Sequence, residues 1–134
     1  MIGILIVSHS KALADGTLEV AKQMADERLP MKAVGGLDDG SIGTDAVRIM
    51  EGLYSVYTEE GVLVFVDLGS SVLSTQMAMD LLGDETMKSN IHIVNAPIVE
   101  GSIVAALQAS IEDPIENIIQ DAENAWEMNK SQGM

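Results

Sequence analysis

The chain begins with an uninterrupted apolar segment that stops abruptly at a histidine between two serines, Ser8-His9-Ser10. Residues 2–7 contain only isoleucine, glycine, leucine and valine, and this lack of polar alternation is typical of a strand buried on both faces. A helical pattern follows at once, so the segment predicts the first half of a βαβ unit. His9 is then expected at the carboxyl end of a strand, where ligands and reactive groups collect in parallel sheets.

The alternation of strand and helix continues along the rest of the chain. Apolar segments predict further strands, and amphipathic patterns predict helices separated by turn residues. The expected strands are at 31–34, 61–66 and 91–94, the expected helices are at about 11–28, 45–57, 69–82, 98–110 and 114–126, and 87–90 is expected to be a connector. Thr44 is expected to cap the second helix.

This alternation predicts a doubly wound α/β fold. Right-handed crossovers give a mainly parallel four-stranded sheet with helices on both faces. The most economical strand order is 2-1-3-4, and an extra edge strand remains an open alternative. Residues 1–134 are expected to form a single domain with a polar, frayed tail from about residue 127.

Apolar residues at helical spacing predict which face of each helix is buried. These are Leu13, Val20 and Met24 in the first helix, Val47, Met50, Tyr54 and Tyr57 in the second, Val72, Thr75, Met79 and Leu82 in the third, Val99, Ile103, Ala106 and Leu107 in the fourth, and Ile115, Ile118, Ile119, Ala122 and Trp126 in the last.

The composition excludes several classes of function. A net charge of −14 with only seven lysines and arginines argues against nucleic-acid and anionic-membrane partners. The acidic surface suits either a basic partner protein or solubility alone. The chain has no cysteine, and no cluster has the ligand spacing of a metal site. No apolar stretch approaches the ~20 residues of a membrane span, and the start lacks the basic region of a signal peptide, so a cytoplasmic location is expected.

The predicted strand order brings His9 and Asp67 together. Each residue follows one of the two central strands, so both side chains are expected in the crevice where the strand order reverses. A carboxylate that accepts a hydrogen bond from one imidazole nitrogen fixes the tautomer and leaves the other nitrogen with a free lone pair. We therefore expect His9 to be a nucleophile that attacks phosphorus, with Asp67 orienting it.

Backbone N–H groups near this crevice are candidates for holding phosphoryl oxygens. Gly69, Ser70 and Ser71 open the third helix at the positive end of its dipole. Gly35 and Gly36 begin a glycine-rich loop that is expected to close another side of the pocket. Each feature has a plainer explanation, because strand-end histidines are often structural, serines cap helices and an aspartate can cap a loop. The second histidine, His92, lies inside a strand and is interpreted as structural or surface-facing.

These motifs resemble a known family. Ser8-His9-Ser10 with Leu13-Ala14, and Asp67-Leu68-Gly69-Ser70, are similar to the mannose-type enzyme IIA domain of the bacterial sugar phosphotransferase system. The similarity extends to one branch, the phosphotransferase subunit of phosphoenolpyruvate-dependent dihydroxyacetone kinase, through the loop Gly35-Gly36-Leu37-Asp38-Asp39-Gly40-Ser41-Ile42-Gly43-Thr44 and through Asn95-Ala96-Pro97.

The resemblance implies a phosphotransferase that carries a phosphoryl group on His9 and holds no permanent cofactor. His9 would take the group from the histidine-containing phosphocarrier protein and pass it to ADP on the nucleotide-binding subunit of dihydroxyacetone kinase. Members are usually homodimeric. Some carry fused carrier domains, and because this chain has none, its phosphate is expected from a separate protein.

Alternative functions differ in the motifs that they require. A sugar-transport enzyme IIA is the first, but that branch typically has Gly-Gly-Ser-Pro where this chain reads Gly69-Ser70-Ser71-Val72. A flavodoxin-like phosphate- or nucleotide-binding module is the second, and it lacks flavin-sandwiching aromatics, a P-loop and Gly-x-Gly-x-x-Gly. A receiver domain needs acidic residues after the first strand, and a serine hydrolase needs Gly-x-Ser-x-Gly.

Overall fold

The computed structural model describes residues 1–132 of the chain. Strands and helices alternate, and two short 3-10 helices (η) follow the last α-helix. The elements are β1 Gly3–Ser8, α1 Lys11–Lys22, β2 Met31–Gly35, α2 Ala46–Val56, β3 Val62–Val66, α3 Gly69–Leu81, α4 Glu85–Ser89, β4 Ile91–Ile93, α5 Ile98–Ser110, α6 Ile115–Glu123, η1 Asn124–Glu127 and η2 Lys130–Gln132.

The four strands form one parallel sheet in the order β2-β1-β3-β4, which confirms the predicted doubly wound α/β fold. The central pair is β1 and β3, with Val7 opposite Val66 at the carboxyl end. No fifth strand occurs within residues 1–132, so the extra edge strand is not found there.

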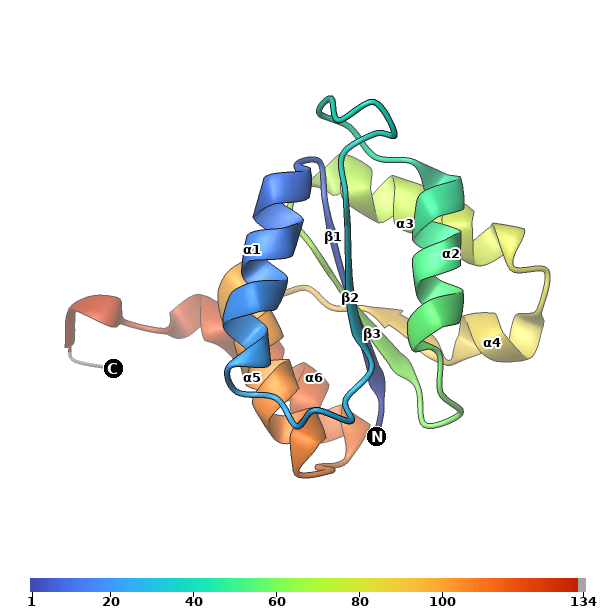
Figure 1. The fold of residues 1–134 in the computed structure, drawn as a ribbon. Coiled ribbons are helices and arrows are strands. Elements are labelled where there is room, and N and C mark those ends of the chain that lie inside the picture. The colour runs from blue at the N-terminus through green and yellow to red at the C-terminus, as the bar shows by residue number, and fades with distance from the viewer. Residues whose placement is uncertain (133–134) are drawn as a thin grey trace.

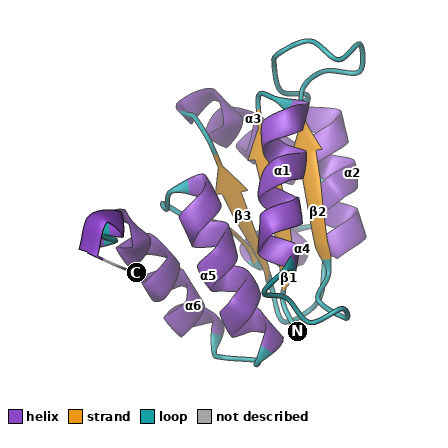
Figure 2. Cartoon of the chain, turned by 60° about the vertical axis from the view of Figure 1, so that its left-hand side comes forward, coloured by secondary structure: helices purple, strands orange, loops and turns teal. Residues whose placement is uncertain are grey.

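Helices cover both faces of the sheet because successive strand residues point to opposite sides and both sets are apolar. On one face, Ile4, Ile6 and Phe65 pack beneath α1, α5 and α6. On the other, Leu5 and Val7 pack beneath α2 and α3. In Figure 1, α1 and α5 lie to the left of the strands and α2 and α3 to the right, and Figure 2 shows the layers from another side.

The buried residues of α1, α3 and α5 are all small, which corrects part of the predicted core. In α1 the buried residues are Ala14, Thr17 and Ala21. Several larger residues that were expected inside are exposed instead, namely Leu13 and Val20 in α1, Met24 just after it, Val47 and Tyr54 in α2, Leu107 in α5 and Trp126 in η1. The strands already fill the interior with isoleucine, leucine, valine and phenylalanine, so little room remains beneath the helices. Other predicted core residues are confirmed, namely Thr75, Leu82, Ala106, Ile118 and Ala122.

Several local boundaries differ from the predictions. The α-helix α1 ends at Lys22 rather than near residue 28. The expected connector before β4 contains the short helix α4, which Asp84 caps by accepting a hydrogen bond from the backbone of Met87. Asp45, not Thr44, caps α2.

The predicted frayed tail is only partly described. Within it, residues 130–132 form η2, and Lys130 makes an ion pair with Glu100 of α5. Residues 133–134 lie outside the described part of the chain. Among the described helices, none combines the length and apolarity that crossing a bilayer requires.

Candidate functional site

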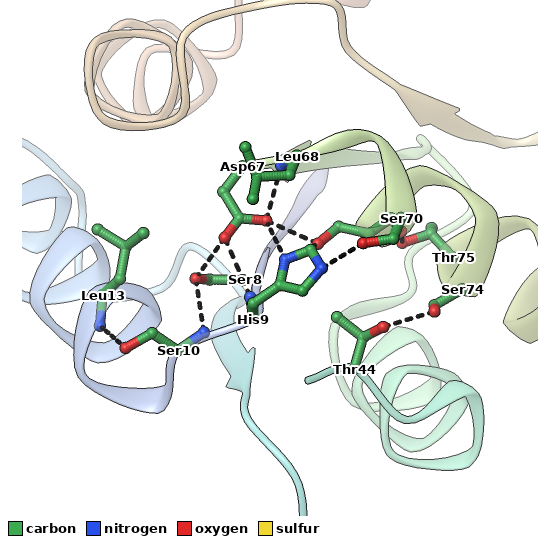
Figure 3. Close-up of polar contacts among 11 residues, drawn as sticks. Ser8, His9, Ser10, Leu13, Thr44, Asp67, Leu68, Ser70, Ser74 and Thr75 are labelled. Carbon is green, nitrogen blue, oxygen red and sulfur yellow. Dashed lines mark hydrogen bonds and ion pairs between the residues drawn. The ribbon is translucent and has the colours of Figure 1, made fainter. Parts of the chain in front are cut away.

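His9 and Asp67 meet at the carboxyl ends of the two central strands. They are the first residues beyond β1 and β3, whose side-by-side register brings both turns together. The Nδ1 atom of His9 lies 3.0 Å from Oδ1 of Asp67. The imidazole is 19% exposed and the carboxylate 10%, so the ring stays accessible while its partner is largely covered. Figure 3 shows the pair and its neighbours.

Asp67 is the acceptor for hydrogen bonds from both sides of the crevice. Its Oδ2 accepts from the Ser8 hydroxyl at 2.8 Å and from the His9 backbone N–H at 3.0 Å. Its Oδ1 accepts from the Ser71 hydroxyl at 2.6 Å and from the Leu68 backbone N–H at 2.8 Å, besides facing the His9 ring. These donors fix the orientation of the carboxylate.

The donors also decide the charge of Asp67. Burial alone raises the pKa of its carboxyl group, but hydrogen bonds from Ser71, the His9 backbone, Ser8 and the His9 ring outweigh burial. They hold the pKa of Asp67 well below its usual range. Because an ionised carboxylate can only accept, the hydrogen-bond network assigns the proton of the neutral ring to Nδ1. The lone pair is then on Nε2, which the Ser70 hydroxyl contacts.

The three residues that open α3 occupy different positions around the ring. Ser70 is exposed, and its hydroxyl hydrogen bonds Nε2 of His9. Ser71 is fully buried; its hydroxyl donates to Asp67, and its N–H donates to the carbonyl of Leu68. Within residues 1–132, no acceptor is found for the N–H groups of Gly69 and Ser70, as is usual in a first helical turn.

The glycine-rich loop holds the His9 turn in place. The N–H of Gly36 was predicted to bind a phosphoryl oxygen, but it donates instead to the carbonyl of Ser8 at 3.3 Å. A Cβ on Gly35 would lie 2.5 Å from the Ser10 carbonyl, so only glycine fits this close approach. Farther along the loop, the N–H of Gly43 donates to the carbonyl of His9 at 2.9 Å.

Several residues that contact the site or its loops were not predicted to do so from the sequence. Ser8 was part of the histidine motif, yet nothing in the sequence pairs its hydroxyl with Asp67. The Arg48 guanidinium donates to the carbonyls of Gly35 and Gly36 and thereby fixes the base of the loop. The Thr44 hydroxyl, predicted as a cap, instead hydrogen bonds Ser74 of α3 at 2.6 Å (Figure 3). These contacts join distant segments, so local periodicity could not reveal them.

Exposed apolar side chains lie on segments at the same end of the sheet. Leu13 is in the first turn of α1, Ile42 is in the glycine-rich loop and Leu68 precedes α3. Beside Asp67 lies a cavity of about 460 Å³, lined among others by Leu68, Val72, Pro97 and Trp126. This end of the molecule therefore combines the accessible His9 ring with apolar surface.

The depressed pKa of Asp67 predicts a loss of stability in acid. Such a group adds stability above its unfolded pKa, about 3.9 for aspartate, and the contribution disappears as pH falls toward the folded value. We expect the difference in unfolding free energy between wild type and Asp67→Asn to be largest near neutral pH and to shrink below about pH 4. Urea unfolding at about pH 7, 4 and 2 measures it.

Glu116→Gln, which removes an exposed carboxylate from α6, is the control for that series. Its difference from wild type should be small at neutral pH. A difference for Asp67→Asn that stays constant from neutral to acidic pH would contradict the assignment of an ionised carboxylate.

Comparison with known proteins finds similarity along nearly the whole chain. A family model described as the PTS system fructose IIA component matches residues 3–119, which include His9 and Asp67. A solved crystal structure of a protein described as being of unknown function matches with a TM-score of 0.81 and 38% sequence identity, covering 92% of this chain and 93% of that one.

Several similar curated proteins are named phosphoryl donor subunit DhaM of PEP-dependent dihydroxyacetone kinase. The protein of Providencia stuartii is 39% identical over 135 residues, and that of Escherichia coli is 38% identical over 135 residues. Both matches cover 98% of this chain but only 28% of the relative, so this chain spans little more than a quarter of their length. The kinase 2 subunit of Listeria innocua is 34% identical over 124 residues, covering 92% of this chain and 98% of the relative.

Proposed function

The chain belongs to the family described as the fructose IIA component of the phosphotransferase system, and on that basis we propose that it is a phosphocarrier. In this proposal His9 accepts a phosphoryl group and then donates it. The observation that carries the proposal is the 3.0 Å contact between Nδ1 of His9 and Asp67. That contact leaves the lone pair on Nε2, in a ring that solvent and a partner can reach.

The chemistry needs one nucleophile and one group that orients it. The Nε2 lone pair attacks the phosphorus of a phosphohistidine donor, the new N–P bond forms, and the old N–P bond breaks with its electrons returning to the donor imidazole. The His9 ring becomes positively charged, and the adjacent Asp67 carboxylate stabilises that charge. Transfer onward repeats the step in reverse, with an oxygen of the acceptor phosphate as the nucleophile.

The beginning of α3 suits the oxygens of the carried group. The Ser70 hydroxyl that contacts Nε2 must turn aside to admit phosphorus, and it can then donate to a phosphoryl oxygen. The N–H groups of Gly69 and Ser70 add the positive end of the helix dipole. Ser71 acts indirectly, because its hydroxyl donates to Asp67. Gly35 and Gly36 also act indirectly, because they shape the loop beside the His9 turn. The phosphoryl group is the only group that the protein carries in this mechanism.

The branch of the family that we propose is the one named in the curated relatives. The donor would be the histidine-containing phosphocarrier protein, and the acceptor would be ADP on the nucleotide-binding subunit of dihydroxyacetone kinase. Support comes from identities of 34–39% to proteins named as phosphoryl donor subunits of that kinase. A sugar-transport enzyme IIA is the second candidate, because the description of the matching family model names fructose.

The surface around His9 suits a protein partner. Leu13, Ile42 and Leu68 are exposed on segments at the same end of the sheet as the ring, and such apolar side chains are typical of protein interfaces. The net charge of −14 favours partners with basic surfaces. A homodimer, which the resemblance to the family implies, and a cytoplasmic location complete the proposal.

Labelled phosphoenolpyruvate tests the proposal. With the general carrier proteins and magnesium, we expect one acid-labile phosphate on the chain, and mass spectrometry should place it on His9. Adding the ADP-loaded nucleotide-binding subunit should move the label to ATP. Transfer only to a sugar-specific transport component would favour the second candidate, and label on Asp67 would indicate receiver chemistry instead.

A further inference from the structure

Two serines that face Asp67 are fully buried. Ser8 is the last residue of β1, and Ser71 lies in the first turn of α3. Each side chain has 0% of its surface exposed. The Ser8 hydroxyl donates to Oδ2 of Asp67 at 2.8 Å, and the Ser71 hydroxyl donates to Oδ1 at 2.6 Å. One hydroxyl therefore holds each oxygen of the carboxylate.

The direction of each hydroxyl proton follows from its other neighbours. The Ser8 oxygen accepts from the backbone N–H of Ser10 at 3.0 Å, so its own proton points to Asp67. The Ser71 oxygen lies 3.1 Å from Nδ1 of His9, which already carries a proton. Its proton therefore also goes to Asp67, and its oxygen can share the Nδ1 proton. The hydroxyls join the His9 turn, the start of α1 and the start of α3.

We propose that Ser8 and Ser71 are positioning residues that hold the Asp67 carboxylate in the plane in which Oδ1 meets Nδ1 of His9. The terminal torsion of an aspartate side chain is broad and has no strong rotamer wells. Without a hydroxyl on each oxygen, the carboxylate can turn away from the ring. Nδ1 then loses its fixed acceptor, and Nε2 is less well held for attack on phosphorus. The kinetic part of this inference rests on the proposed function.

The first test observes the ring directly and needs no activity. In the wild-type protein, the Nδ1 proton lies between Asp67 and Ser71, so its resonance should be visible far downfield in the proton spectrum. In Ser8→Ala and Ser71→Ala we expect its exchange with water to become about tenfold faster, because a buried donor to the carboxylate is lost. Ser8→Cys preserves the shape with a much weaker donor and should behave like Ser8→Ala.

The matched control is Ser102→Ala. Ser102 is also a fully buried serine, but its hydroxyl donates to the Ile98 carbonyl within α5 and not to His9 or Asp67. Its loss should change overall stability without changing the Nδ1 proton. Thermal unfolding of every variant shows that the fold is retained.

The second test measures phosphoryl transfer. In the Ser8 and Ser71 variants, kcat should fall about tenfold while KM for the phosphorylated donor stays within about twofold, because buried hydroxyls do not contact the docking protein. Exchange and kcat that match Ser102→Ala would overturn the inference. If the wild-type protein accepts no phosphate, the proposed function fails, and the exchange measurement alone still decides the role of the serines.

Discussion

Replacing His9 by alanine is expected to abolish phosphorylation of the chain, with a loss of at least about 10³-fold in the rate of phosphoryl acceptance. The reason is that in the proposed function Nε2 of His9 forms the bond to phosphorus, and an alanine side chain supplies no nucleophile in its place. The measurement is the amount of acid-labile label that the chain takes up from phosphoenolpyruvate through the general carrier proteins.

His92→Ala is the matched control, because the chain has only two histidines. His92 lies in the edge strand β4 and pairs with Leu63 of β3 in the sheet, so it is tied to the fold and not to the crevice. Its substitution should leave labelling intact. Comparable labelling of His9→Ala and wild type would rule out the phosphohistidine, whereas loss of label only in His92→Ala would move the reaction to a different part of the sheet.

Asp67→Asn is expected to slow phosphoryl transfer by about 10²–10⁴-fold while the chain still folds. The amide keeps the size of the carboxylate but can accept at only one of its two terminal atoms. Hydroxyl and N–H donors from both sides converge on those two atoms. A side-chain NH₂ group therefore faces a donor in either orientation, and the charge that stabilises the phosphorylated ring is gone.

The tautomer of the His9 ring is a second property by which the effect of this substitution can be measured. If the amide NH₂ faces Nδ1, that nitrogen must present its lone pair, and the proton moves to Nε2, where it blocks attack on phosphorus. Nitrogen chemical shifts of the His9 ring distinguish the two tautomers. Asp67→Ala, which removes charge and acceptor together, should also fold and transfer slowly. Normal transfer rates in both variants would remove the orienting role of Asp67.

The strand order of the fold could be predicted because it depends on patterns that are local in the sequence. Each strand is a short apolar segment, each crossover is long enough for a helix, and right-handed connections leave few possible arrangements. The approximate position of the site followed from the same pattern, since residues 9 and 67 both directly follow central strands. Proximity of His9 and Asp67 therefore required no knowledge of side-chain packing.

The buried faces of the helices were harder to predict. Leu13 and Val20 have the spacing of a core face, yet Ala14 and Ala21 lie beneath α1. Apolar periodicity indicates a broad stripe, but the side chains already on the strands decide which part of that stripe touches the sheet. The large residues then spread over the flanks of the helix, where they are half-exposed.

By itself, the sequence determined the parallel sheet, its strand order and the two residues that directly follow its central strands, because apolar periodicity and chain connectivity are properties of neighbouring residues. Only the tertiary structure decided that hydroxyls from β1 and α3 hold Asp67, that the Gly36 N–H is occupied by Ser8, and that Ser70 contacts Nε2 of His9. Apart from the local contact between Ser71 and Asp67, these hydrogen bonds require ångström-level placement of segments about 30 to 60 residues apart. That placement comes from the packing of the whole core.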